Sequence, residues 1–123
     1  MNFVYVGLGG AIGAISRYAI SLIPYKGDFH FLTLITNVIG AFLIGIIAAI
    51  AVKNNASHQM ILFIKTGICG GFTTFSTFSL ESFNLFSSKR YLMGTAYIIA
   101  SVLLCIAAVY AGGKVIDCYS QPL

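Results

Sequence analysis

Charged residues are scarce in this chain, and their scarcity limits the classes of protein it can belong to. They make up 8% of the 123 residues, whereas hydrophobic residues make up 59%. A soluble domain usually carries about 25% charged residues, and a globule of this size has too little interior to hide so much apolar surface from water. The composition therefore predicts an all-α integral membrane protein whose apolar side chains face lipid or other subunits.

Acidic residues are scarcer still, because Asp28, Glu81 and Asp117 are the only carboxylates in the chain. The two histidines, His30 and His58, fall in the polar breaks between apolar stretches, and no glycine fingerprint for nucleotides is present. These groups are too few and too dispersed to form a catalytic constellation. We therefore expect no enzymatic activity.

Basic residues give a net charge of +4, but they are scattered rather than clustered. Most lie between hydrophobic stretches or at their ends, where membrane proteins keep their charges. We therefore expect no binding to nucleic acid. The seven basic residues are Arg17, Lys26, Lys53, Lys65, Lys89, Arg90 and Lys114.

Cysteine is also rare and odd in number, since only Cys69, Cys105 and Cys118 occur. Their positions suggest neither a disulfide framework nor a metal-ligand spacing, and the first two lie inside apolar runs, where we expect packing roles. The first 23 residues lack a basic leading segment and a small-residue cleavage site. They are therefore predicted to be a retained membrane span and not a signal peptide.

Four apolar stretches fill the chain, at about residues 2–23, 31–52, 60–87 and 90–112. A helix needs about 20 residues to cross the hydrocarbon core, and each stretch is long enough. The connecting segments are short, so neighbouring spans must run antiparallel. The sequence thus predicts one transmembrane domain over residues 1–123 with four helices, embedded in the cell membrane.

The third stretch is longer than a span requires and carries Gly67, Gly70 and Gly71, followed by a run rich in threonine and serine. Glycine and β-branched residues together disfavour a continuous helix. A break at membrane depth must be buried in protein or line a watery cavity, and broken helices often form ion sites. We expect a third helix broken near its middle; a continuous helix packed through small residues is the alternative.

The loops show almost no charge asymmetry, and such asymmetry normally sets the orientation of a membrane protein. One side of the membrane collects three basic residues and the other collects four. The simplest interpretation is insertion in both orientations, with opposed copies pairing as an antiparallel homodimer about a two-fold axis in the membrane plane. Alternatively, folding or a partner fixes one orientation. The two sets are Lys53, Lys65 and Lys114 against Lys26, Lys89, Arg90 and Arg17.

Two polar residues occur where lipid-facing positions would be apolar. Arg17 shares a helical face with Gly9 and Gly13, and a charge here should point inward or reach the interface. It is either an anion-attracting group or a simple anchor. Asn37 lies about 9 Å into the second span, at 1.5 Å per residue. Its amide offers two N–H donors, either to an anion or to a neighbouring helix.

A third feature is the segment around Phe75 and Phe78, which includes Ser76 and Thr77. Aromatic ring edges carry partial positive character, so two ring edges beside hydroxyl and amide donors would suit a small anion stripped of water. Two phenylalanines at this spacing are also common in simple packing.

The fourth span repeats a polar residue every four positions, at Tyr97, Ser101 and Cys105, which predicts a polar stripe along one helical face. Glu81 should lie on the same side of the membrane as Arg17, because both occur late in parallel spans. A structural ion pair is the conservative interpretation of this carboxylate.

Three motifs together resemble the Fluc (CrcB-type) fluoride channels. The first is Gly9-Gly10 with Gly13-Ala14 and Arg17-Tyr18, and the second joins Asn37, Gly40, Phe42 and Gly45. The most specific one is Gly70-Gly71-Phe72-Thr73-Thr74-Phe75-Ser76-Thr77-Phe78, and the resemblance covers essentially the whole chain.

The resemblance implies an antiparallel homodimer with two pores that exports fluoride passively and relieves fluoride toxicity. It implies that Asn37, Phe75 and Phe78 line the fluoride path and that Arg17 serves the vestibule. The backbone carbonyls of Gly70 and Thr73 would hold a structural sodium ion (Na⁺) on the dimer axis. The polar track would consist of Ser76, Thr77, Tyr97 and Ser101, with Cys105 standing where a hydroxyl residue is expected.

Two other function classes compete with a channel. A proton-coupled exporter of the small multidrug-resistance type also has four spans, but such proteins rely on a membrane-embedded glutamate in the first span. The first span here has no acid and carries Arg17 instead. The third class is a structural subunit of a membrane assembly, which fluoride flux from liposomes holding this protein alone would exclude.

Overall fold

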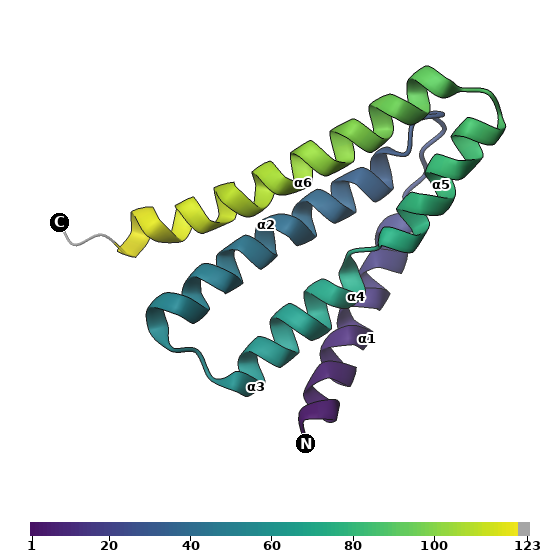
Figure 1. The fold of residues 1–123 in the computed structure, drawn as a ribbon. Helices are drawn as coiled ribbons and strands as arrows, with labels where there is room; N and C mark the ends of the chain where they lie inside the picture. The colour runs from purple at the N-terminus through teal and green to yellow at the C-terminus, as the bar shows by residue number, and fades with distance from the viewer. Residues whose placement is uncertain (121–123) are drawn as a thin grey trace.

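A computed structural model describes residues 1–120 of the chain, and these residues form helices joined by short loops, without a β-strand among them (Figure 1). In chain order the elements are α1 (Asn2–Ser21), α2 (Phe31–Asn54), α3 (His58–Ile61), the π-helix η1 (Leu62–Cys69), α4 (Gly70–Phe72), α5 (Phe75–Ser87) and α6 (Tyr91–Ser120).

Four helical stretches are long and apolar enough to cross a membrane, as predicted, and the protein is a multi-pass integral membrane protein. The first, second and fourth are α1, α2 and α6, and the third runs from His58 to Ser87 through α3, η1, α4 and α5. The fourth helix continues past residue 112 to Ser120. Its added turns contain Asp117, whose carboxylate lies 2.6 Å from the Lys53 ammonium at the end of α2.

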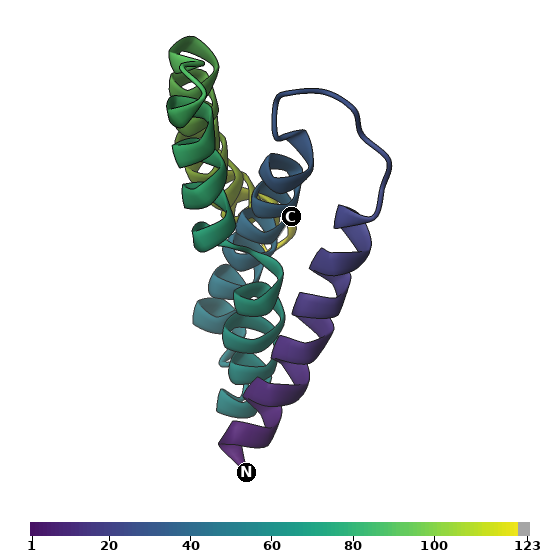
Figure 2. The ribbon, with the colours of Figure 1, turned by 90° about the vertical axis from the view of Figure 1, so that its right-hand side faces the viewer.

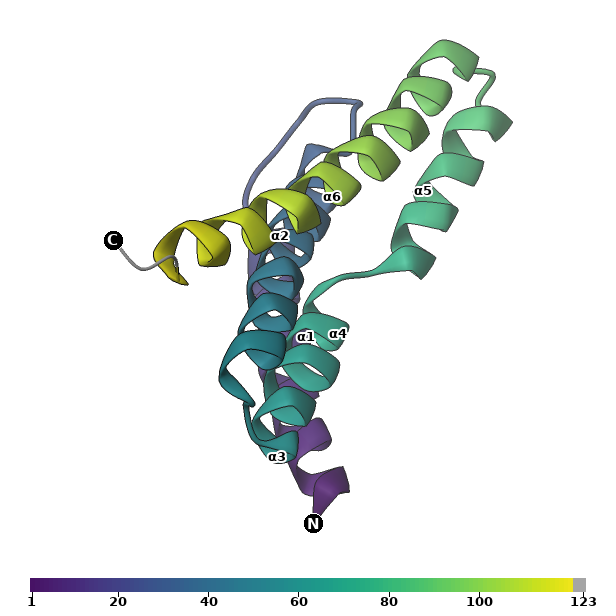
Figure 3. The same ribbon diagram turned by 60° about the vertical axis from the view of Figure 1, so that its left-hand side comes forward.

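The helices pack in two groups. One group is the long pair α2 and α6, which lie side by side in Figure 1. In the other group, α1 packs along η1 and α4, the first half of the third span (Figure 2). Helix α5 leaves the second group at the break and pairs with α6 (Figure 3). The break therefore lets one span belong to both groups.

Glycine makes both groups possible, because it lets backbones touch. A Cβ atom on Gly9 or on Gly13 would collide with backbone atoms of the third span, at Phe63 and Ile68. Similarly, a Cβ on Gly45 would collide with the backbone of Val109 in α6. The shared helical face of Gly9 and Gly13 is thus a packing surface for η1.

Few side chains are buried inside one copy of the chain. The buried cluster consists of Leu34, Leu85 and Tyr97, whereas many large apolar side chains are exposed, with Phe3 at 93% and Leu92 at 87%. Because lipid solvates apolar side chains as well as a protein interior does, a membrane protein can leave them outside.

The third span is broken, as predicted, but the interruption lies at the threonines and not at the glycines. Gly67, Gly70 and Gly71 are all helical, and the backbone becomes extended at Thr73 and Thr74. The physical reason is packing, since a Cβ on Gly67 or on Gly71 would collide with the backbone of α1. Here glycine supports a tight helix–helix contact and not a bend.

Candidate functional site

Thr74 begins the second half of the third span as the N-cap of α5. Its backbone is extended, with φ −148° and ψ 116°, and its hydroxyl oxygen accepts a hydrogen bond from the Thr77 N–H at 3.2 Å. The first N–H groups of a helix have no partner within the helix, and a threonine hydroxyl is a favoured cap for one of them. The capping role of Thr74 was not predicted, although its position before Phe75-Ser76-Thr77 fits a cap.

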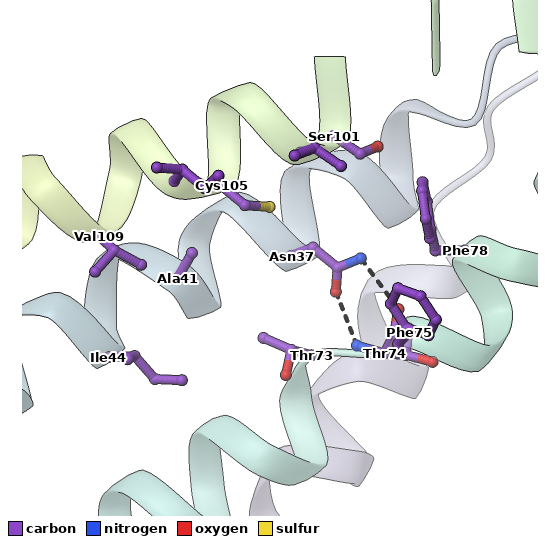
Figure 4. Close-up of a pocket in the computed structure, with 12 residues that line it drawn as sticks. Asn37, Ala41, Ile44, Thr73, Thr74, Phe75, Phe78, Ser101, Cys105 and Val109 are labelled. Carbon is purple, nitrogen blue, oxygen red and sulfur yellow. Dashed lines mark hydrogen bonds between the residues drawn. The ribbon is translucent and has the colours of Figure 1, made fainter. Parts of the chain in front are cut away.

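Asn37 of α2 closes the gap that the break leaves in the backbone hydrogen bonding. Its Oδ1 accepts from the Thr74 N–H at 2.8 Å, and its Nδ2 donates to the Thr74 carbonyl at 3.1 Å (Figure 4). A broken span would leave these buried groups unpaired at a cost of several kcal/mol. Asn37 therefore ties α2 to the start of α5, and one of its two N–H donors remains for another partner.

A cavity of about 370 Å³ lies beside this junction, between α2, α6 and the break. It brings together Asn37, Phe75, Phe78 and Ser101, four residues for which the resemblance to the Fluc family implies a place on the fluoride path. In Figure 4 they converge from three helices, with Cys105 one turn beyond Ser101 along α6. Thr73 also lines this cavity.

Three aromatic rings follow one another from the cavity into the protomer: Phe75 and Phe78 line the cavity, whereas Tyr97 does not line it and contacts Phe78. The ring centroids of Phe75 and Phe78 are 5.6 Å apart, and those of Phe78 and Tyr97 are 5.3 Å apart. Their planes are tilted by about 50° in both pairs, so ring edges as well as faces are presented. Phe75 is 79% exposed, whereas Tyr97 is fully buried. The series runs from the outer surface of the protomer to its interior.

The polar stripe of α6 faces inward. Ser101 is buried, and its Oγ has no hydrogen-bond partner among residues 1–120. An unpaired buried hydroxyl is unfavourable unless a ligand or water completes it, and this one lies on the cavity wall. Cys105 lines the same wall with a thiol, which is a weaker donor than a hydroxyl.

Arg17 and Thr77 lie at a second, smaller cavity of about 80 Å³, together with Thr33 and Thr74. The Arg17 Nε donates to the Gly71 carbonyl at 3.1 Å. Ser76 is exposed on the first turn of α5 and borders neither cavity. The structure therefore places some of the predicted site residues at two cavities that meet at Thr74, whereas Ser76, Tyr97 and Gly70 line neither of them.

Glu81 and Arg17 do not form an ion pair, although their expected position on the same side of the membrane suggested one. Glu81 Oε1 accepts from the Thr33 hydroxyl at 2.6 Å, and Oε2 accepts from the Tyr97 hydroxyl at 3.1 Å. His30 Nδ1 is 3.0 Å from the same Oε2. The expectation failed because Arg17 faces the break, where an open carbonyl is available to it.

Comparison with known proteins identifies the family. A model of the family described as "CrcB-like protein, Camphor Resistance (CrcB)" matches residues 4–113. The chain belongs to this family. The CrcB chain is 43% identical over 116 residues to a Ruminiclostridium cellulolyticum protein named fluoride-specific ion channel FluC, which covers 91% of this chain and 89% of that protein.

Two further relatives carry a similar name. A FluC protein of Agrobacterium fabrum is 41% identical over 91% of this chain and 93% of its own length. FluC 1 of Staphylococcus aureus is 37% identical over 92% of this chain and 98% of its own. The CrcB similarity thus spans both cavities, the break and all four helices.

The break in this CrcB chain also leaves two carbonyl oxygens without their helical N–H donors. The Thr74 N–H, which would bond to the Gly70 carbonyl in a continuous helix, donates to Asn37 instead. The Thr77 N–H donates to the Thr74 hydroxyl and not to the Thr73 carbonyl. Within residues 1–120, neither Gly70 nor Thr73 keeps the donor that a continuous helix would supply.

Backbone carbonyl oxygens are the candidate ligands for a cation here. The described part of the chain has no group of three or more His, Cys, Asp or Glu side chains able to bind a metal. Carbonyl oxygens suit hard cations such as alkali ions. The open carbonyls of Gly70 and Thr73 therefore fit a sodium ion in donor type.

Proposed function

We propose that this chain is a fluoride-selective channel that lets fluoride leave the cell passively across the cell membrane and so relieves fluoride toxicity. The observation that carries the proposal is the cavity wall formed by Asn37, Phe75, Phe78 and Ser101. It combines ring edges with uncommitted N–H and O–H donors and has no acid among its lining residues. The names of the relatives support fluoride as the ion.

Selectivity follows from the chemistry of this wall. Fluoride is small and strongly hydrated, so it enters a narrow apolar site only if hydrogen-bond donors replace its water. Ser101 offers a buried hydroxyl without a protein partner, and Phe78 and Tyr97 present tilted rings beside it. Chloride is larger and has a lower charge density, so the same donors would stabilise it less. Arg17, at the second cavity, would attract anions towards the break.

The exporter alternative has no support in this chain. Proton coupling of that type requires an ionisable acid inside the first span, and α1 contains none. The chemistry of an enzyme is also not supported, because the family relatives are named as ion channels.

The proposed assembly is an antiparallel homodimer embedded in lipid. Phe75 lines the cavity and yet is 79% exposed, so the cavity is incompletely walled in a single copy. A second copy of the chain would supply the missing wall, and opposed copies are compatible with the balanced loop charges. The dimer would contain two such paths.

A structural sodium ion on the dimer axis completes the proposal. Gly70 is exposed on the protomer surface next to the break, and its carbonyl and that of Thr73 lack their helical donors. Two opposed copies would bring four such oxygens together. The positive charge of the ion would lower the energy of anions nearby, because Coulomb attraction is strong in a medium of low dielectric constant.

Fluoride efflux from liposomes is the decisive test. Purified protein in liposomes loaded with potassium fluoride should release fluoride down its gradient when valinomycin balances the charge, and the same liposomes loaded with chloride should release almost none. Comparable chloride efflux, or no fluoride efflux above protein-free liposomes, contradicts the channel.

A further inference from the structure

Glu81 of α5 is held by α2 and α6, beside Tyr97, the first residue of the polar stripe of α6. Thr33 of α2 and Tyr97 of α6 donate to its two oxygens, and His30, the N-cap residue of α2, lies against the second oxygen at 3.0 Å. The Glu81 side chain is only 15% exposed, whereas that of His30 is 35% exposed. The histidine is thus the more exposed member of the pair.

Glu81 lines neither cavity, but its hydrogen-bond partners connect it to both. Thr33 lines the smaller cavity together with Arg17, and Tyr97 stacks beside Phe78, which lines the larger one. A negative charge at this position would repel an anion in either cavity, and more strongly because the site is partly desolvated. Conduction of an anion past Glu81 therefore requires compensation of its charge.

His30 is the group placed to compensate it. Arg17 is bonded to the Gly71 carbonyl, and Arg90 is paired with Asp28 at 2.8 Å. Lys26 and Lys89 are exposed in the two loops that contain Asp28 and Arg90. Among the residues of α2, α5 and α6 in direct contact with Glu81, only the imidazole can carry positive charge.

We propose that His30 is a positioning residue that makes fluoride conduction depend on pH through Glu81. This inference rests on the proposed channel function. A protonated His30 neutralises Glu81, and fluoride passes readily; a neutral His30 leaves the carboxylate charge uncompensated and slows fluoride entry. Either form can donate from Nδ1, so the contact persists and only its charge changes. Histidine is the side chain that ordinarily changes charge between about pH 5 and pH 8.

The test is the rate of fluoride efflux from liposomes with equal pH on both sides, from about pH 5.5 to about pH 8.5, the range that brackets ordinary histidine titration. The wild-type rate should fall by about fivefold as pH rises, which corresponds to an interaction of roughly 1 kcal/mol. Protein-free liposomes correct for leakage of hydrogen fluoride. A wild-type rate that does not change with pH overturns this inference but leaves the channel standing, whereas no efflux at any pH overturns both.

Variants assign the pH dependence to this pair. His30→Gln keeps a donor without a titratable group and should give a flat profile close to the wild-type rate at high pH. Glu81→Gln removes the charge to be compensated and should also give a flat profile. His58→Gln, at the start of α3, is the matched control and should keep the wild-type slope. A wild-type slope in His30→Gln or in Glu81→Gln, or a flat profile in His58→Gln, overturns the proposal.

Discussion

The side chain of Asn37 pairs with both backbone polar groups of Thr74. Its Oδ1 accepts from the Thr74 N–H at 2.8 Å, and its Nδ2 donates to the Thr74 carbonyl at 3.1 Å. The two residues are 37 positions apart in the chain. This pair fixes the start of α5 against α2, and the cavity wall depends on where α5 starts.

Asn37→Ala should therefore weaken both folding and conduction. The substitution leaves the N–H and the carbonyl of Thr74 unpaired, at about 1–3 kcal/mol for each group, and it removes an N–H donor from the cavity. We expect a lower thermal unfolding midpoint in detergent and a loss of most fluoride efflux. Asn84→Ala on the exposed face of α5 is the control and should change neither. Wild-type efflux in Asn37→Ala would show that the amide is dispensable.

Phe75→Ile and Phe78→Ile should each reduce fluoride efflux without unfolding the protein. Isoleucine keeps the apolar character at some loss of size, a change that cores usually tolerate at less than about 1.5 kcal/mol. It removes the ring edge, whose interactions are worth about 1 kcal/mol, so we expect a decrease of about fivefold or more. Phe3→Ile, at a position 93% exposed on α1, is the control. Full efflux in both variants would assign the rings to packing alone.

Gly9→Ala should destabilise the protein, whereas Gly7→Ala should not. A Cβ on Gly9 would collide with the backbone of the third span, but a Cβ on Gly7 would meet nothing within 4 Å. Overpacking of this kind costs about 1–3 kcal/mol. Unfolding in a graded series of denaturing detergent would measure the difference, and equal stability of the two variants would refute the close packing of α1 on η1.

Insertion should occur in both orientations. A C-terminal reporter should be reached from either side of the membrane in similar amounts, because the loops carry three basic residues against four. Adding two or three lysines to one set of loops should bias insertion and reduce efflux, and co-expression with the oppositely biased variant should restore it. A single orientation of the unmodified protein would argue against an antiparallel dimer.

Removal of sodium should weaken the dimer. If four carbonyls from Gly70 and Thr73 hold Na⁺, purification in a large organic cation should leave them unpaired in a dry interior, which is costly. We expect slower efflux and a larger monomer fraction on size exclusion, both reversed by adding sodium. Identical behaviour with and without sodium would mean that water satisfies these oxygens.

The class of the protein and its four spans follow from the amino-acid sequence alone. Apolar length and the scarcity of charge decide this directly, because lipid accepts only long apolar helices whose backbone is internally paired. The motif around Phe75 and Phe78 also identified the family and the residues that later proved to share a cavity wall with Asn37 and Ser101.

The position of the break in the third helix and the contacts of Glu81 depend on how the helices pack. Glycine can either bend a helix or let it pack, and the backbone of α1 against Gly67 and Gly71 selects packing, which moves the break to Thr73 and Thr74. Similarly, the sequence suggested only Arg17 as a partner of Glu81, and the contact with His30 was not predicted. Arg17 turned to the carbonyl that the break exposed, so the histidine remained, because a hydrogen-bond partner is chosen by which groups the packed helices bring within reach.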